Sequence, residues 1–506
     1  MKHNKRLIAI ILLFSCVLCH AGTTVTTFEE LLAANNNEET EIHLNAASFV
    51  LTEDLVIDHN CVIDITYEGD VTIDGNDLYK TFFKNNIAII GNPAGDHRLI
   101  FTQGDDITVL IDNPISNTTL TFYYCDFSEA KTSKGFEITG VNPVTTNVTC
   151  INCRSMNNYN DGFSISTSGT TTRTTLTCYN CISSDNGPGS AQGFTTHRAN
   201  EVLFIYGGSA TNNAAAGIGC YGGEVYAFDV TLEGGIYIDP AGGGRTAKIV
   251  LDGITLTYAR TSRGIWIKTT DGNYDSYFVL RNSYIEGSSN AEGGVWVTKD
   301  CVVVIENTVV TGFTKTGKYG IYLGSGRTVP AILRNCTISG NYRNVYLLGN
   351  MTMTNCIIAN SVQYGIRGNI TTLYAAGPSG YNIFYNNGSN YDDDGSQVLT
   401  DAELAALKPY VNDQNIDPQF VDAANGDFRL GPGSPCLNAG RATPNRGYTD
   451  IGAWQGISRS ILLPDNCEEW LEMDFNGDCK VDFEDFALFT RSWLECNLEP
   501  EEMCWQ

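Results

Sequence analysis

One short pattern of apolar and polar residues repeats along most of this sequence. Stretches such as NVTCINCRS (147–155), TLTCYNCIS (175–183) and MTMTNCII (351–358) align without gaps, and the units recur every 20 to 30 residues. Each unit holds two short segments in which apolar and polar residues alternate, joined by loops of variable length. Repeats of this length predict a solenoid of parallel β-strands, in which every coil stacks on the one before it.

A first column of equivalent positions is headed by one small or apolar residue per unit: Cys125, Cys153, Cys181, Gly208, Val230, Gly253, Ser283, Thr308, Cys336 and Cys356. Three residues earlier the units have Phe122, Cys150, Cys178, Ile205, Ala227, Val250, Leu280, Ile305, Leu333 and Met353. The residue directly before the head is often asparagine: Asn152, Asn180, Asn282, Asn307, Asn335 and Asn355. Asparagine tolerates a left-handed backbone and can bond to its counterpart on the next coil, so we expect a ladder of turn asparagines.

A second column pairs a glycine, in one unit an asparagine, with a large apolar residue. Its members are Gly135-Phe136, Gly162-Phe163, Gly193-Phe194, Gly217-Ile218, Gly235-Ile236, Gly264-Ile265, Gly294-Val295, Gly320-Ile321, Asn344-Val345 and Gly365-Ile366. Because side chains alternate along a strand, we expect the first and third residues after the glycine to point into the core. The second and fourth residues then point outward.

The outward positions carry the candidate binding residues. Two residues after the glycine, five successive coils have an aromatic residue: Tyr237, Trp266, Trp296, Tyr322 and Tyr346. Four residues after it stand His197, Tyr221, Asp239, Lys268 and Thr298, with Arg198, Arg260 and Arg263 nearby in the sequence. Aromatic faces match the apolar faces of sugar rings, and rungs ~4.8 Å apart are close to one sugar unit. The stripe is therefore either a platform for a polysaccharide or an ordinary ladder of stacked rings.

The repeat unit, together with the opening stretch LVIDHNCVIDITYEGDVTIDGN (55–76), resembles the right-handed parallel β-helix of pectate-lyase-like proteins. The resemblance covers about residues 40–400 and implies an all-β fold over 22–400. It does not specify an activity, because this fold is used by lyases, hydrolases, adhesins and tail spikes.

The ends of the chain differ from the repeat. Residues 1–21 have a basic start, an apolar run and a closing alanine, which predicts a signal peptide and a secreted or cell-surface protein. No later apolar run is long enough for a membrane span. Residues 401–456 include IDPQFVDAANGDFRLGPGSPCLNAG (416–440), which is similar to the closing segment of exported bacterial β-helix proteins, so we expect a cap there and a linker over 457–466.

The last segment, 467–506, contains a candidate calcium loop. Oxygen ligands stand at alternating positions, with Lys480 contributing its carbonyl: Asp474, Asn476, Asp478, Lys480, Asp482 and Asp485. The loop and the apolar helix after it resemble one half of a type I dockerin, which implies Ca²⁺ binding and a cohesin-like partner. Dockerins have two such loops and this chain has one, with Cys479 where the loop usually has glycine.

Charge and composition narrow the function. The formal net charge of −26 argues against nucleic acid as a partner. Hydrolysis of a glycoside needs two carboxylates, for which Asp239 is the main candidate, with Asp161, Asp185 and Glu292 in loops. β-Elimination of a uronate needs a base, here His197 or Lys268, and a cation such as Arg198, Arg260 or Arg263. We expect a secreted protein that depolymerises a polysaccharide, with a lyase ahead of a hydrolase; the alternative is a non-catalytic glycan-binding or adhesin-like protein.

The pairs TCINC (149–153) and TCYNC (177–181) raise the question of a zinc site. Their cysteines fall in columns whose other members are small or apolar, which favours core positions. Neighbouring rungs lie within disulfide range, so oxidation of Cys150 with Cys178 or of Cys153 with Cys181 stays open.

Overall fold

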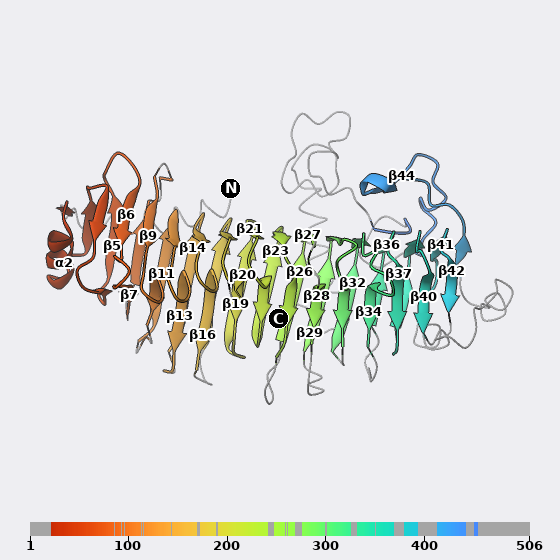
Figure 1. The fold of residues 1–506 in the computed structure, drawn as a ribbon, viewed down its shortest axis with the longest axis horizontal. Helices are drawn as coiled ribbons and strands as arrows, with labels where there is room; N and C mark the ends of the chain where they lie inside the picture. The colour runs from red at the N-terminus through yellow and green to blue at the C-terminus, as the bar shows by residue number, and fades with distance from the viewer. Residues whose placement is uncertain are drawn as a thin grey trace, which may run out of the picture. The chain divides into compact units, whose positions relative to one another are not determined.

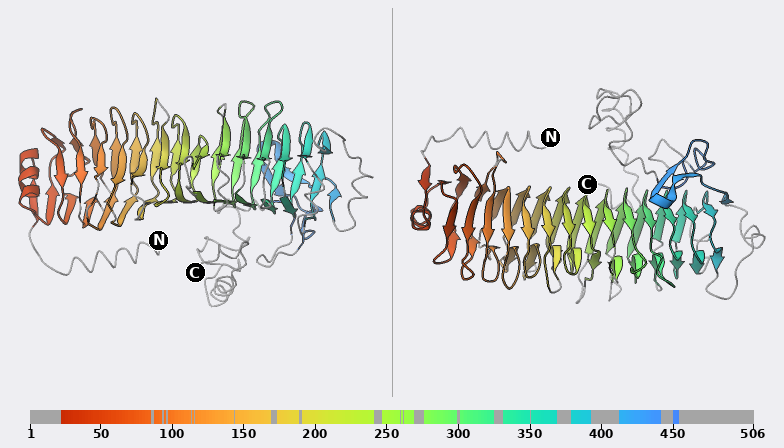
Figure 2. Two further views of the ribbon diagram at one scale, coloured as in Figure 1. Left: turned by 90° about the horizontal axis from the view of Figure 1, so that it is seen from below. Right: turned by 45° about the horizontal axis from the view of Figure 1, so that its top comes forward.

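The computed structural model describes residues 22–453, except 85–86, 93, 96, 113, 115, 143, 169–172, 189–190, 241–246, 259, 261, 269–275, 299–300, 325–330, 350, 369–378, 393–411 and 442–449. The expected signal peptide, linker and dockerin-like segment lie outside the described residues. The chain divides into two compact units, 1–225 (unit 1) and 226–506 (unit 2). In both units the described chain winds through short parallel strands, coil upon coil (Figures 1 and 2).

Unit 1 begins with a strand, β1, and a helix, α2 (Phe28–Asn36), which lies at the start of the stack (Figure 1). A capping box fixes the start of the helix: the Glu30 amide donates to the Thr27 hydroxyl, and the Glu30 carboxylate accepts from the Thr27 amide. The helix buries Phe28, Leu31 and Ala34, and the Asn35 side chain donates to the Val56 carbonyl at 2.8 Å. The first coil thus receives an apolar cover.

Each coil of unit 1 gives one strand to each of three parallel sheets. The first sheet contains β1 (Thr23–Val25), β2 (Glu41–Leu44), β5 (Cys61–Ile65), β8 (Ile87–Gly91), β11 (Thr118–Tyr123), β14 (Thr146–Ile151), β17 (Thr174–Tyr179) and β20 (Glu201–Tyr206). The second contains β4 (Leu55–Ile57), β7 (Thr81–Phe83), β10 (Val109–Ile111), β13 (Phe136–Gly140), β16 (Phe163–Thr167), β19 (Gln192–Thr196) and β22 (Ala216–Cys220). The third contains β3 (Ser48–Val50), β6 (Val71–Asp74), β9 (Leu99–Thr102), β12 (Cys125–Ser128), β15 (Arg154–Met156), β18 (Ile182–Ser184) and β21 (Ser209–Thr211).

Unit 2 follows the same plan, and β23 (Gly223–Phe228) runs across the boundary between the units. Its first sheet contains β26 (Ala247–Asp252), β29 (Tyr277–Arg281), β32 (Val302–Glu306), β35 (Ala331–Arg334) and β38 (Met351–Thr354). Its second contains β25 (Ile236–Ile238), β28 (Arg263–Ile267), β31 (Gly293–Val297), β34 (Tyr319–Leu323), β37 (Arg343–Leu347), β40 (Tyr364–Gly368) and β42 (Ser389–Asp392). Its third contains β24 (Thr231–Glu233), β27 (Thr255–Thr257), β30 (Tyr284–Glu286), β33 (Val309–Thr311), β36 (Thr337–Ser339), β39 (Ile357–Ala359), β41 (Ile383–Tyr385) and β43 (Gln414–Asn415).

The turn asparagines adopt the left-handed backbone that the repeat predicted. All six have φ between 47° and 54°: Asn152, Asn180, Asn282, Asn307, Asn335 and Asn355. Part of the expected ladder of side chains forms. Asn307 Nδ2 donates to Asn282 Oδ1 at 2.8 Å, and Asn282 Nδ2 donates to Asp252 Oδ1 at 2.7 Å. Since the side chains of Asn335 and Asn355 donate instead to the backbone carbonyls of Asp450 and Arg441, respectively, the ladder ends against the later chain.

One unit of the sequence alignment was wrong by one residue. Leu251 pairs with Leu280, and Thr255 pairs with Tyr284, so the head of this unit is Ile254 and its apolar partner is Leu251. Gly253, taken from the sequence as the head, has φ 69° and occupies the turn position that asparagine holds elsewhere. Glycine and asparagine both adopt positive φ, and glycine is also small enough for the core position after the turn. Residue size alone therefore cannot show which of the two positions a glycine occupies.

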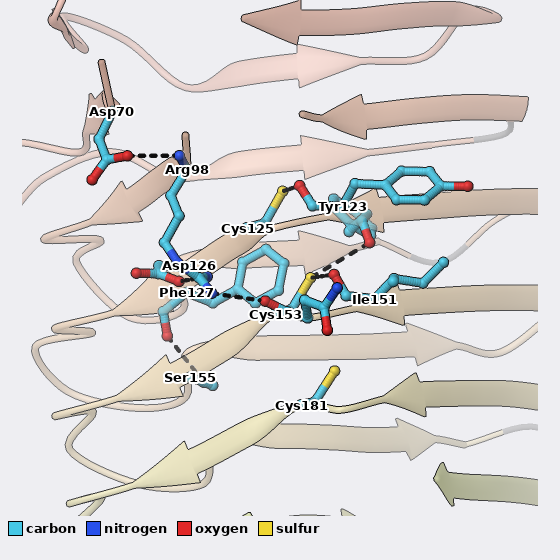
Figure 3. Close-up of polar contacts among 12 residues, drawn as sticks. Asp70, Arg98, Tyr123, Cys125, Asp126, Phe127, Ile151, Cys153, Ser155 and Cys181 are labelled. Atoms are coloured by element: carbon cyan, nitrogen blue, oxygen red, sulfur yellow. Dashed lines mark hydrogen bonds and ion pairs between the residues drawn. The ribbon is translucent and has the colours of Figure 1, made fainter. Parts of the chain in front are cut away.

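The cysteines of the two C-x-x-C pairs are core residues. Cys150 and Cys178 pair in register on β14 and β17, and both are fully buried. Cys125, Cys153 and Cys181 follow one another from coil to coil (Figure 3). As thiols they donate to backbone carbonyls, for instance from Cys153 Sγ to the Ile151 oxygen at 3.5 Å. Oxidation of either pair stays a prediction.

The segment expected to cap the helix is described over 412–441 and 450–453. Its strands β44 (Phe420–Asp422) and β45 (Asp427–Leu430), joined by the 3₁₀ helix η1 (Ala423–Asn425), form a hairpin beside the third sheet of unit 2 (Figures 1 and 2). One apolar cluster joins Cys436 and Ile451 to Ile357, Ala359 and Ile383. A second joins Phe428 and Ala453 to Val309. The described part of this segment therefore covers the outer face of that sheet.

Candidate functional site

The five aromatic residues of the stripe lie in register on the second sheet of unit 2, as the repeat predicted. Tyr237 pairs with Trp266, Trp266 with Trp296, Trp296 with Tyr322, and Tyr322 with Tyr346. All five are partly exposed, while the residues on either side of each are buried. We call this column the aromatic strip.

The rings of the strip lie against one another and against arginine. Trp296 and Tyr322 stack with centroids 3.9 Å apart and an interplanar angle of 8°. The Arg263 guanidinium lies between the two indoles, 4.2 Å from the Trp266 centroid and 4.6 Å from that of Trp296. Both faces of the Trp296 ring are therefore occupied. The other neighbouring rings meet at steeper angles, 66° between Tyr237 and Trp266 and 54° between Tyr322 and Tyr346.

A second column, which the sequence reading did not separate out, lies beside the strip. It consists of the residues directly before the glycine column, where Arg263 pairs with Gly293, Gly293 with Tyr319, and Tyr319 with Arg343. A side chain at Gly293 would place its Cβ 3.0 Å from the Trp296 ring, so glycine makes room for the stack. The sequence indicates this column by a large polar or aromatic residue directly before the glycine or asparagine of the repeat, in Arg263-Gly264, Tyr319-Gly320 and Arg343-Asn344.

Arg343 is held by neutral groups at the far end of the strip. It donates to the Tyr319 hydroxyl at 2.7 Å, the Gln363 side-chain oxygen at 2.6 Å and the Gly317 carbonyl at 3.1 Å. Its guanidinium lies 5.1 Å from the Tyr319 ring, which stacks on Tyr346 at 4.8 Å. A guanidinium with neutral partners keeps its full charge available for an anion.

Asp239, Lys268 and Tyr237 form a polar group at the start of the strip. Lys268 Nζ lies 3.0 Å from Asp239 Oδ2, and the Tyr237 hydroxyl donates to the same oxygen at 2.7 Å. The Asp239 side chain is 8% exposed, and among the described residues its Oδ1 accepts no hydrogen bond. The Lys268 side chain is 41% exposed. Lys268 is therefore the accessible cation of this group.

Two other predicted residues of unit 2 have less favourable positions. Glu292 is shared between Arg263 at 3.8 Å and Lys315 at 3.5 Å, so it is engaged as a counter-ion. Arg260 lies close to Gly234, before the first ring of the strip. Neither arrangement gives Asp239 the second carboxylate that hydrolysis requires.

His197 and Arg198 belong to unit 1, where they surround a buried carboxylate. Their backbone amides both donate to Glu201 Oε2, from Arg198 at 2.9 Å. The amide and hydroxyl of Thr167 donate to Glu201 Oε1 at 2.6 and 2.9 Å. Burial raises the pKa of the fully buried Glu201 to about 7, although all four donors act in the opposite direction. The contact fixes the backbone on which the His197 ring is mounted.

The His197 ring stacks on Tyr221 with centroids 5.3 Å apart, at the edge of a polar cluster. We use this name for Lys134, Glu137, Asp161, Ser164, Gln192 and Thr195, on and beside the second sheet of unit 1. Gln192 Nε2 donates to the Tyr221 hydroxyl at 2.7 Å, and Lys134 Nζ lies 2.5 Å from Glu137 Oε1. From the sequence, only Asp161 had been considered, as a loop carboxylate. Glu137 and Thr195 stand two residues after Gly135 and Gly193, which are outward positions of the repeat, and this is how the sequence could have indicated the cluster.

The predicted calcium ligands Asp474, Asn476, Asp478, Lys480, Asp482 and Asp485 lie outside the described residues. Calcium binding thus stays a prediction from the sequence. Asp185 lies on a turn of unit 1, where its carboxylate accepts a hydrogen bond from the Asn212 side chain at 2.6 Å.

One comparison with known proteins agrees with the fold. A family model described as a right-handed β-helix region matches residues 263–405. Among solved structures, the catalytic domain of a GH87 α-1,3-glucanase in complex with tetrasaccharides aligns at 14% identity and a TM-score of 0.27, covering 79% of this chain and 69% of that one. A search of curated proteins finds no match. In the part of the chain that the structure describes, no helix is long and apolar enough to cross a membrane. The described chain is a right-handed, all-β parallel solenoid.

Proposed function

We propose that this protein is a secreted carbohydrate-active protein that binds a polysaccharide along the aromatic strip. The observation that carries the proposal is the register of five aromatic rungs on one outer face, with Arg263 between two of them. Five rungs span roughly 19 Å at the strand spacing of ~4.8 Å, which is several sugar units. A regular surface of this length suits a ligand that is itself a regular polymer.

The stacking determines how such a ligand would bind. Because Tyr322 and Arg263 lie on the faces of the Trp296 ring, contacts at this rung would come from ring edges, tyrosine hydroxyls and the cations above the rings. Lys268 lies 6.0 Å from the Trp266 centroid and Arg367 lies 5.7 Å from that of Tyr346. In a chain of net charge −26, this is a place where an acidic glycan meets cations. We therefore favour uronate-bearing chains.

For the reaction, unit 2 fits β-elimination better than hydrolysis. Lys268 would neutralise the uronate carboxylate, which acidifies the proton on the adjacent carbon. Because Lys268 already lies against Asp239, we assign it the role of the cation. The Tyr237 oxygen would take the proton from the sugar carbon as its own hydroxyl proton passes to Asp239 Oδ2. The bond from the neighbouring carbon to the glycosidic oxygen would then break, with water supplying the proton for that oxygen. His197, the other base expected from the sequence, lies in unit 1 and is not required for this assignment.

The terminal segments complete the proposal. The leader 1–21 would export the protein, and the loop of 467–506 would bind Ca²⁺ and present a docking surface to a cohesin-like partner. Both rest on the sequence motifs.

The test uses the full chain and a panel of acidic, esterified and neutral polysaccharides. Trp266→Ala and Trp296→Ala should each weaken binding of an acidic polysaccharide about tenfold or more, equivalent to ~1.4 kcal/mol. Tyr179→Ala is the matched control, because Tyr179 stacks on Tyr206 at 5.0 Å on the first sheet of unit 1 and is not a residue of the strip. Unchanged binding in both tryptophan variants would refute the strip as the binding surface.

Catalysis is measured separately by the ultraviolet absorbance of unsaturated products. Lys268→Met should abolish that signal while the variant remains folded. If the wild type binds an acidic polysaccharide but forms no unsaturated product, the non-catalytic glycan-binding function replaces the lyase.

A further inference from the structure

The polar cluster of unit 1 occupies outward positions that unit 2 fills with aromatic rings. Glu137 pairs in register with Ser164, and Ser164 with Thr195, each two residues after its glycine. All three are buried, at 7%, 0% and 0% exposure. Lys134, Asp161 and Gln192, each directly before its glycine, belong to the same three coils. Burial of so many polar groups on an outer face requires that they satisfy one another or a ligand.

Most members of the cluster do bond to one another. Lys134 Nζ lies 2.5 Å from Glu137 Oε1, and Asp161 Oδ1 accepts from the backbone N–H of Gln192 at 2.9 Å. The Gln192 side chain continues to the Tyr221 hydroxyl. A Cβ at Gly219 would lie 2.9 Å from the Gln192 side chain, so the glycine there makes room for this amide.

The two carboxyls have different environments. Glu137 is paired with the ammonium group of Lys134, whose Nζ lies 2.5 Å from Glu137 Oε1. Burial raises the pKa of Asp161, and the charge of Glu137 raises it further, against the opposing effects of Lys134 and the Gln192 amide. Pairs of carboxyls whose environments differ in this way divide the roles of acid and base between them.

An independent observation points to a ligand. Ser164 lies between Glu137 and Thr195 in register, and its hydroxyl is buried without a hydrogen-bond partner among the described residues. Buried hydroxyls in proteins are nearly always bonded, so an unbonded one inside a polar cluster marks the place of an external hydrogen-bonding group. A sugar hydroxyl is such a group.

We propose that this cluster is a second active site, which hydrolyses a glycosidic bond with Asp161 as the acid and Glu137 as the base. Asp161 transfers its proton to the glycosidic oxygen as the bond from that oxygen to the anomeric carbon breaks. Water adds its oxygen to the anomeric carbon and passes its proton to Glu137. Ser164 and Gln192 bind hydroxyls of the same sugar. The inference takes a glycan ligand from the proposed function but does not depend on the aromatic strip.

The experiment measures release of reducing ends from the polysaccharide panel by the full chain and two isosteric variants, Glu137→Gln and Asp161→Asn. Each should lower hydrolysis about 100-fold or more, the usual contribution of a general acid or base. Asp185→Asn is the control, since the Asp185 carboxylate bonds to Asn212 on a turn outside the cluster. Thermal melts establish that the variants are folded.

If an isosteric variant fails to fold, a second experiment tests the role of Glu137 by chemical rescue. Glu137→Ala leaves space beside Lys134, and added formate should restore hydrolysis in this variant but not in Asp161→Asn. Hydrolysis at the wild-type rate in both isosteric variants would overturn the proposal, and so would a wild type that binds but hydrolyses no member of the panel. The two proposals are separated by Trp266→Ala. If this variant loses polysaccharide binding but still hydrolyses short oligosaccharides, the strip binds the polymer and the polar cluster hydrolyses it independently.

Discussion

At the scale of single residues, Glu201 shows how a buried charge organises a loop. Its carboxylate gathers three backbone amides and one hydroxyl from two coils of unit 1. Nothing in the repeat pattern distinguishes this residue, because it stands at the start of a strand where other coils have Thr146 or Thr174. The turn that holds His197 depends on it.

The Glu201 carboxyl should make stability depend on pH. Its pKa rises from 4.5 to about 7 on folding. The folded state then holds the proton more tightly, so this stabilisation is complete below about pH 4.5 and is lost as the pH rises towards 7. In denaturant titrations, the free energy of unfolding should fall over this range by up to about 3 kcal/mol. Glu201→Gln should flatten the fall, and an unchanged pH slope in that variant would contradict the assignment.

At the scale of elements, the turn asparagines set the register of the coils. Each places one residue in the left-handed region between a strand of the first sheet and the following strand of the third sheet. The sequence revealed this element well, because φ > 0 restricts the residue type to asparagine or glycine in most coils. It failed at Gly253, where glycine itself took the turn position.

Asn307 allows the backbone and the hydrogen bond to be measured separately. Asn307→Ala should destabilise the protein by about 2 kcal/mol, from the left-handed backbone and the lost bond to Asn282. Asn307→Gly keeps the backbone freedom and should cost about 1 kcal/mol. Urea denaturation of the two variants gives the comparison. A glycine variant less stable than the alanine variant would show that the backbone conformation is not the main term.

At the scale of the whole molecule, the chain after the last coil returns to the outer face of unit 2. Phe428 is 2% exposed against Val309 and Ala453, and it meets Phe420 edge-on at 5.2 Å. The hairpin therefore protects a sheet face that would otherwise expose valine and isoleucine.

Phe428→Ala tests that contact. Removal of a buried phenylalanine should cost about 3 kcal/mol and make the segment 412–453 more sensitive to proteolysis. Leu437→Ala is a suitable control, because Leu437 is 37% exposed on the same segment. Equal protease sensitivity of Phe428→Ala and the wild type would mean that the hairpin is held by its backbone bonds instead.

The loop expected in residues 467–506 predicts that the protein binds one calcium ion. Isothermal titration of the full chain should find one Ca²⁺ site, and Asp474→Ala should remove it because the first ligand of the loop is lost. Asp465→Asn, in the expected linker, is the control. Equal calcium binding by the wild type and Asp474→Ala would refute the loop.

The sequence by itself determined the coil, the turn asparagines and the register of the aromatic strip. These features repeat with the period of the chain, and stacking equivalent coils turns a sequence period into a spatial column. The tertiary structure decided how the columns are used. Arg263 enters between Trp266 and Trp296, and Lys134, Asp161 and Gln192 gather from successive loops. The positions of these polar residues, directly before the glycines, recur in the sequence, but the contacts that they make depend on side-chain directions, which follow from packing.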